Sequence, residues 1–200
     1  MGFWEQKTVK TWTKTCLLFC SILLFQCTGS TDNSEKLPFY NTPDFTPIFI
    51  ENPISVDSLI HHKISDFAFL DEDSVVFSSE MMKNKIHVAN FIFTSCGSIC
   101  PTMTKNFKLV GDAFPNDSDF EMLSFSVTPW IDTPSKLKNY KTQNQITQKN
   151  WHFLTGNKAD IYALARTSYF AEEDLGFTKD STEFLHTEHV LLVDKNQHIR

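Results

Sequence analysis

Glycine and basic residues are both in short supply in this sequence. Only 6 of the 200 residues are glycine, whereas 19 are phenylalanine. This composition indicates one packed globular domain and argues against a disordered or fibrous chain. The formal net charge is −6, and residues 1–26, with three lysines against one glutamate, contribute +2, which leaves −8 on the remainder. An acidic body without a basic patch excludes nucleic acid as a partner.

The N-terminus lacks an apolar run long enough to cross a bilayer. Its apolar run, Cys16–Phe25, has about ten residues where a spanning helix needs roughly 20, and it follows a lysine-containing segment at 7–14. This pattern is typical of an export signal. A cysteine at the end of the run, Cys27, resembles the lipidated cysteine of bacterial lipoproteins, although Phe25 and Gln26 are larger than the residues usual before it. The alternatives are an uncleaved anchor and a conventional cleaved signal.

The predicted export of the protein places its cysteines in an oxidising compartment, and this limits what they can do. The chain has five, of which three lie in the predicted signal, so the folded body has only Cys96 and Cys100. In an oxidising compartment such a pair forms a structural disulfide, a redox couple or a metal site. A structural disulfide is the least favoured of these, because a bridge that closes so short a loop restricts the unfolded chain little.

Strands and helices are expected to alternate after residue 65. The predicted order is a β-hairpin at 67–69 and 75–77, strands at 87–93, 122–127, 151–154 and 189–193, helices after Pro101, from Thr133 and near 161–165, and a last hairpin over 194–200. This alternation predicts βαβ units in a mainly parallel sheet, to which the last hairpin adds antiparallel strands. Prolines exclude a long helix from the arm at 37–64. A cysteine pair at a strand-to-helix turn points to an α/β, thioredoxin-like fold: a central mixed sheet flanked by helices, plus the N-terminal β-hairpin.

The cysteine motif, Cys96-Gly97-Ser98-Ile99-Cys100-Pro101, places two sulfurs at or just before a helix N-terminus. The free amides and the positive end of the helix dipole there stabilise thiolate over thiol. Three residues separate the cysteines, so both sulfurs can face one cation or close into a disulfide. Two thiolates suit Cu(I), whereas zinc usually takes four ligands and the folded body has only two cysteines. An imidazole is the most natural third ligand.

Position selects His186 among the seven histidines. His186 lies on the connection that enters the last long strand, which a thioredoxin-like sheet places next to the helix with the cysteines. His189, three residues later, faces the opposite side of an extended chain. The histidines of the arm, His61 and His62, are expected to be solvated, and His152 begins a strand and is expected to lie at an interface.

Four motifs in register carry a family resemblance over roughly residues 65–200. They are Phe93-Thr94-Ser95-Cys96 to Ile99-Cys100-Pro101, Ser126-Val127-Thr128-Pro129 with Asp132-Thr133-Pro134, Trp151-His152-Phe153-Leu154-Thr155-Gly156, and His186-Thr187 with Leu191-Leu192-Val193-Asp194. Together they resemble the Sco/SenC family of copper-binding, thioredoxin-fold cytochrome c oxidase assembly proteins. The resemblance implies copper held by Cys96, Cys100 and His186. It also implies delivery of that copper to the dinuclear copper site of cytochrome c oxidase, or reduction of the cysteines of that site beforehand.

Three departures from the family pattern concern acidic residues. Gly97-Ser98 replaces an acid between the cysteines, Leu185 stands where many members have Asp before the histidine, and Thr128 replaces the Asp usual after the second strand. Loss of these acids weakens the orientation of His186 and bears on copper affinity more than on the fold.

The sequence leaves two classes of function open. The first is a copper metallochaperone whose partner is the oxidase subunit with the dinuclear copper site. The second is a metal-independent thiol–disulfide oxidoreductase or redox sensor that acts on another thiol protein through Cys96 and Cys100. Which thiol attacks is not given by the sequence. A thiol peroxidase ranks below both, since nothing identifiable supplies the Arg or Gln that would activate peroxide.

We expect three regions in the chain. Residues 1–27 form a signal or lipoprotein segment, 28–64 a tether and extended arm, and 65–200 the thioredoxin-like Sco domain. We expect this domain to be C-terminally incomplete at Arg200, because the fold normally continues with the rest of the strand and a closing helix. The expected location is the cell envelope, with the protein anchored to the membrane and facing the periplasm.

Overall fold

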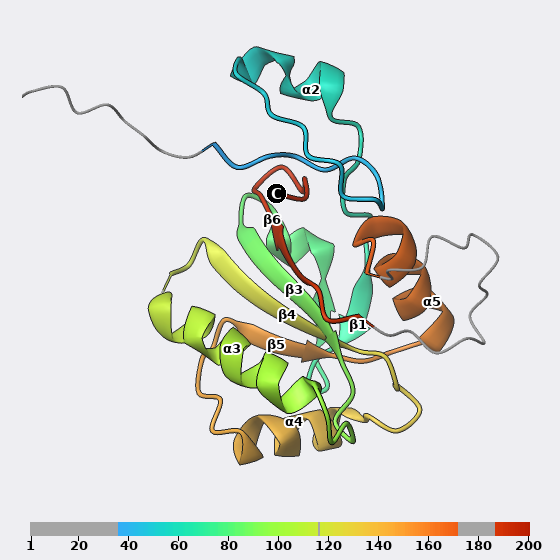
Figure 1. The fold of residues 1–200 in the computed structure, drawn as a ribbon. Helices are drawn as coiled ribbons and strands as arrows, with labels where there is room; N and C mark the ends of the chain where they lie inside the picture. Colours follow the sequence, from blue (N-terminus) through green and yellow to red (C-terminus); the bar gives the residue numbers. More distant parts are fainter. Residues whose placement is uncertain (1–35, 116, 172–186) are drawn as a thin grey trace, which may run out of the picture. The chain divides into compact units, whose positions relative to one another are not determined.

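A four-stranded mixed sheet lies at the centre of the structure, a computed structural model that describes residues 36–115, 117–171 and 187–200. The strands lie in the order β5 (Trp151–Leu154), β4 (Phe120–Ser126), β3 (Ile86–Ile92) and β6 (Val190–Val193). Strands β3, β4 and β5 are parallel, and β6 is antiparallel to β3 (Figure 1). The predicted mixed sheet is therefore confirmed. Leu37–Arg200 forms one compact unit.

The other elements cover the two faces of this sheet (Figure 1). On one face lie the helices α3 (Cys100–Ala113) and α4 (Pro134–Gln143). The other face is covered by the hairpin β1 (Ala68–Leu70) and β2 (Val76–Ser78), and by α5 (Lys158–Ala163), which continues into a π-helical turn, Leu164–Ser168. The remaining helical segments are short: the 3₁₀ turns Pro53–Ser55 and Ser79–Met82, and α2 (Val56–Leu59).

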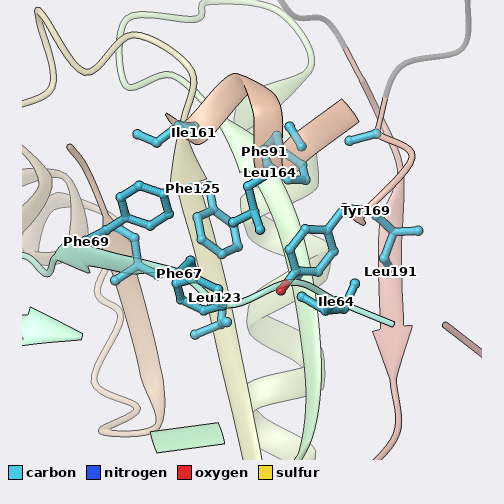
Figure 2. Packing of buried hydrophobic residues seen from close by; sticks show 14 of the residues in the cluster. Ile64, Phe67, Phe69, Phe91, Leu123, Phe125, Ile161, Leu164, Tyr169 and Leu191 are labelled. Atoms are coloured by element: carbon cyan, nitrogen blue, oxygen red, sulfur yellow. The ribbon is translucent and has the colours of Figure 1, made fainter. Parts of the chain in front are cut away.

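Side-chain alternation along the strands divides the core into two clusters. On β4, Met122 packs with Phe107 of α3 and Leu137 of α4, whereas its neighbour Leu123 faces the other cluster. The larger cluster, shown in Figure 2, joins the hairpin and α5 to the sheet through aromatic side chains. Among these contacts, Phe125 stacks on Phe91 with ring centroids 5.3 Å apart. Because both faces are covered, the three parallel strands are almost continuously buried, and most of their residues are apolar, as expected of a parallel sheet.

The predicted elements occur in the predicted order, with small shifts in their ends. The strand predicted at 151–154 has those bounds, and the hairpin strands lie one residue later than predicted. The third helix begins at Lys158, three residues before its first predicted apolar position, because the Asn157 side chain caps it by accepting hydrogen bonds from the backbone N–H groups of Ala159 and Asp160. The last hairpin forms through an antiparallel bridge between Val193 and Ile199.

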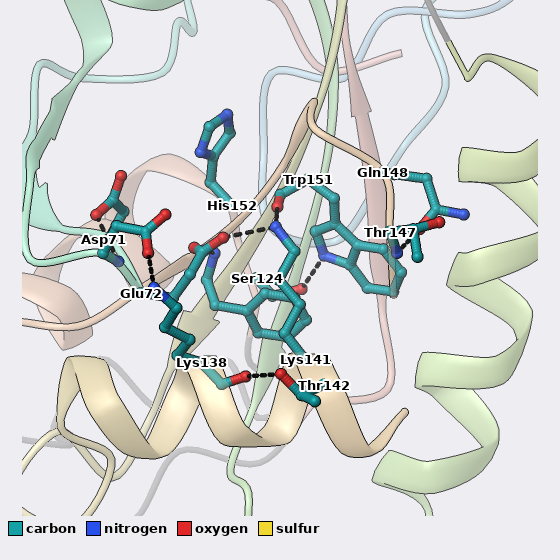
Figure 3. A network of polar contacts seen from close by, with 12 residues as sticks. Asp71, Glu72, Ser124, Lys138, Lys141, Thr142, Thr147, Gln148, Trp151 and His152 are labelled. Carbon is teal, nitrogen blue, oxygen red and sulfur yellow. Dashed lines mark hydrogen bonds and ion pairs between the residues drawn. The ribbon is translucent and has the colours of Figure 1, made fainter. Parts of the chain in front are cut away.

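A buried polar network fixes α4 against the sheet (Figure 3). Glu72, 6% exposed, accepts from Lys141 Nζ of α4 at 2.5 Å and from the Phe153 backbone N–H at 2.9 Å. Lys141 also donates to the Trp151 carbonyl at 2.5 Å. Such fully paired buried charges hold one arrangement of the elements that carry them. None of the helices in the described ranges is long and apolar enough to span a bilayer.

Candidate dithiol and metal site

Cys96 and Cys100 lie at the turn from β3 into α3, as the sequence predicts. The connecting segment, 93–99, leaves the C-terminal end of β3, and α3 begins at Cys100 with Pro101 in its first turn. The Cys96 backbone N–H donates to the Phe93 carbonyl at 3.2 Å, which folds the segment back on itself. Both cysteines are free thiols; Cys100 is buried at 4% exposure and Cys96 is half-buried.

The Cys96 sulfur is surrounded by hydrogen-bond donors from the start of α3. Burial raises its pKa, but hydrogen bonds from the backbone N–H groups of Cys100, Ser98 and Ile99, and from the Cys100 thiol, outweigh burial and lower the pKa of Cys96 below its ordinary value. These are the unpaired amides that every helix N-terminus presents. The predicted thiolate stabilisation therefore falls on Cys96.

Cys100 has the opposite environment. Burial raises the pKa of Cys100 to about 11, and the neighbouring Cys96 sulfur adds to the increase. The more exposed thiol, Cys96, is thus the more acidic one, and the buried Cys100 thiol keeps its proton as a hydrogen-bond donor to it. An asymmetry of this kind suits a pair in which one thiol attacks a disulfide and the other resolves it.

Asp132 is the residue of this site whose role the sequence does not reveal. Its carboxylate is fully buried and accepts hydrogen bonds from the Thr94 backbone N–H (3.1 Å) and hydroxyl (2.5 Å), two residues before Cys96. The hydroxyls of Ser126 and Thr128, at the end of β4, donate to it at 2.7 and 2.9 Å. Thr128, which replaces an acid of the family pattern, is thus a donor to Asp132. The signal available in the sequence is the parallel pairing of β3 and β4, which brings the loops after both strands to one edge of the sheet.

Tyr140 of α4 completes the surroundings of the pair. Its hydroxyl lies 2.8 Å from the hydroxyl of Thr104, which is on α3 four residues after Cys100. Burial raises the pKa of Tyr140, and the nearby sulfurs of Cys100 and Cys96 and the carboxylate of Asp132 contribute to the increase. The tyrosine therefore stays protonated, with its hydroxyl paired to that of Thr104.

The described residues hold two of the three predicted ligands. His186 lies outside the described residues, and within them no group of three or more His, Cys, Asp or Glu side chains could hold a metal ion. The histidines set aside in the sequence have other contacts: His62 Nε2 lies 2.7 Å from the Ser168 carbonyl, His152 Nε2 lies 3.4 Å from Glu121, and the His189 ring lies against Phe45. The two adjacent sulfurs suit a soft ion such as Cu(I) and leave a third position to be supplied.

Comparison with known protein families gives one family. Residues 58–200 match the sequence model described as SCO1/SenC. A SCO1 protein homolog from Bacillus subtilis is 32% identical over 114 residues, which cover 56% of this chain and 59% of that protein. The chain spans about three fifths of the length of the curated relatives it matches, 59% and 63% for the first two. Other relatives are named for copper binding or hold copper in their solved structures.

Solved structures of this family share the fold. A SCO1/SenC family lipoprotein from Bacillus anthracis is 28% identical, with a TM-score of 0.59 over 69% of this chain and 82% of that one. BsSco, a member of the Sco family of cytochrome c oxidase assembly proteins in which a disulfide switch has been identified, is 27% identical, with a TM-score of 0.56 over 69% of this chain and 80% of that one. The predicted thioredoxin-like fold and the resemblance to this family are confirmed.

Proposed function

Because this chain belongs to the SCO1/SenC family, we propose that it binds one copper ion through Cys96, Cys100 and His186 and supports the assembly of cytochrome c oxidase. The proposed partner is the oxidase subunit with the dinuclear copper site. Copper is the cargo, so the site must both hold the ion and release it. The observation that carries the proposal is the hydrogen-bonded contact of the Cys96 and Cys100 sulfurs at the start of α3.

The chemistry of these donors supports copper as the ion. Two adjacent sulfurs, of which Cys96 is readily deprotonated, are soft ligands that favour Cu(I) over hard cations. The register between β3 and β6 supports His186 as the third ligand: Asn90 pairs with Val190, so the chain enters β6 at the end of β3 that leads to Cys96. The ligand set itself is a proposal.

Exposure suggests the order in which the cysteines release the ion. Cys96 is the more exposed sulfur, and Cys100 lies behind it at 4% exposure. A thiolate of the acceptor can therefore reach an ion bound at this pair first on the Cys96 side. Cys100 and His186 hold the ion until a second acceptor thiolate replaces them.

A titration of the reduced full chain in detergent, without oxygen and against a chromophoric Cu(I) chelator, tests the copper proposal. Wild type should bind one equivalent, and Cys96→Ala, Cys100→Ala and His186→Ala should each weaken binding by more than tenfold. His61→Ala removes an exposed imidazole of the arm and is the matched control, which should bind as wild type does. Binding of no copper by the wild type, or equal binding by His186→Ala, would refute the proposed ligand set.

The asymmetry of the two thiols supports thiol–disulfide exchange as a second candidate function. In this reaction the Cys96 thiolate attacks a disulfide of the partner, one partner thiolate leaves, and a mixed disulfide forms. Cys100 then loses its proton and attacks the Cys96 sulfur, which releases the second partner thiolate and leaves a Cys96–Cys100 disulfide. This function predicts that His186→Ala keeps full activity with a disulfide substrate whereas either cysteine variant loses it.

Attachment to the membrane through Cys27 is part of the proposal. Residues 1–35 lie outside the described part of the chain, so the export signal and the lipidated cysteine rest on the sequence. The family member from Bacillus anthracis is a lipoprotein, which supports this anchor.

A further inference from the structure

Two consecutive residues directly before Cys96 are held by side chains from outside their loop. Thr94 donates through both its backbone N–H and its hydroxyl to the carboxylate of Asp132. Ser95 accepts a hydrogen bond from Lys136 Nζ at 3.1 Å. Lys136 Nζ also lies 3.6 Å from Asp132 Oδ1, one helical turn away in sequence. We call this arrangement of Asp132 and Lys136 around Thr94 and Ser95 the clamp.

The clamp has a rigid base. Asp132 is fully buried, and its Oδ2 also accepts from Ser126 and Thr128, whose hydroxyls mark the end of β4. The register of β3 and β4 brings this base next to the cysteine loop, because Ser126 pairs with Ile92, the last residue of β3 before that loop. Movement of the carboxylate would leave several buried donors without partners, at about 1–3 kcal/mol each.

We propose that Asp132 and Lys136 are positioning residues that keep the Cys96 sulfur beside that of Cys100. Neither side chain needs to touch the partner or the ion. By holding Thr94 and Ser95, they fix the start of the loop from which Cys96 extends. The loop then loses little conformational entropy when the two sulfurs come into contact. Such preorganisation raises the effective concentration of one reacting group at the other. The inference rests on the proposed function only in taking Cys96 and Cys100 as the working pair.

The equilibrium of the pair with glutathione tests the clamp on metal-free full chain in detergent. The reaction is protein dithiol plus oxidised glutathione, giving protein disulfide plus two reduced glutathiones. Thr94→Val removes the hydroxyl hydrogen bond to Asp132 without any change of charge. It should lower the equilibrium constant for disulfide formation about tenfold, which makes the reduction potential of the Cys96–Cys100 disulfide about 30 mV less negative. Lys136→Met, which releases Ser95, should shift it in the same direction.

Ser124→Ala is the matched control. It removes a buried hydroxyl of β4 whose partners, Asn90 and Trp151, are not part of the clamp, so it should lower the melting temperature as Thr94→Val does and leave the glutathione equilibrium within twofold of wild type. A shift in Ser124→Ala equal to that in Thr94→Val would overturn the proposal, because general loss of stability would then account for both. An unchanged equilibrium in Thr94→Val with a lowered melting temperature would overturn it as well.

The copper proposal and the clamp can fail separately. Wild-type protein that binds no Cu(I) refutes the copper role, whereas the glutathione equilibria are measured without metal and still decide the clamp. If copper binds and all variants keep the wild-type equilibrium, the clamp is refuted and the copper role stands.

Discussion

Cys96 should react with iodoacetamide at pH 7 far faster than Cys100. The pKa of Cys100 is raised to about 11, two units above its ordinary value of 9.0, while that of Cys96 lies below 9.0. Cys100 therefore has at least about 100-fold less thiolate. Nucleophilicity falls with pKa by a Brønsted coefficient of about 0.4–0.5, which returns a factor of about 6 to 10 to Cys100. The net preference for Cys96 is roughly tenfold or more, and the burial of Cys100 increases it.

The assay is a short pulse of iodoacetamide on the reduced full chain, quenched with acid. The singly alkylated peptide that contains both cysteines is then fragmented in the mass spectrometer to locate the modified sulfur. Cys96→Ser gives the rate of Cys100 alone, which should stay slow because burial is the main cause of its raised pKa. Equal modification of the two sulfurs, or faster modification of Cys100, would refute the assignment of Cys96 as the attacking thiol.

Three further predictions concern stability and location. Glu72→Gln leaves Lys141, whose side chain is only 17% exposed, without its counter-charge (Figure 3), so the free energy of unfolding in urea should fall by about 3 kcal/mol; an unchanged value would contradict the role given to this network. Burial lowers the pKa of His87 to about 3 from its ordinary 6.5, so its neutral form stabilises the fold fully above pH 6.5 and this contribution is lost as pH falls toward 3. Urea unfolding between pH 7 and 4 should show a smaller loss of stability for His87→Leu than for wild type, and parallel losses would contradict it. Cys27→Ser should move the exported protein from the membrane fraction to the soluble one, and unchanged membrane association would point to an uncleaved anchor.

Much of the fold follows from local pattern. The apolar, β-branched and aromatic runs define the strands because both faces of the parallel sheet are covered, and Pro101 and Thr133 mark helix starts that the structure shares to within one residue. The cysteine pair is found at its predicted strand-to-helix turn because the apolar run before it and Pro101 after it define the strand and the helix. Element ends shift by up to three residues, since caps such as Asn157 add a turn before the apolar positions begin.

The chemistry of the site depends on contacts that local pattern does not contain. Which thiol is acidic depends on the direction of the Ser98, Ile99 and Cys100 amides, and the two cysteines are equivalent in the sequence until those directions are known. The role of Asp132 depends on the register of β3 with β4, which brings Thr94 within hydrogen-bonding distance of a residue 38 positions away. The third ligand, His186, stays a prediction.

X-ray absorption at the copper edge, on the Cu(I)-loaded full chain, measures the central claim directly. Convergence of two thiolates and one imidazole on a single ion predicts two sulfur neighbours and one nitrogen neighbour for copper in the wild type. The nitrogen should be lost in His186→Ala and retained in His61→Ala. Copper surrounded by sulfur alone in the wild type, or a nitrogen neighbour that persists in His186→Ala, would contradict the account.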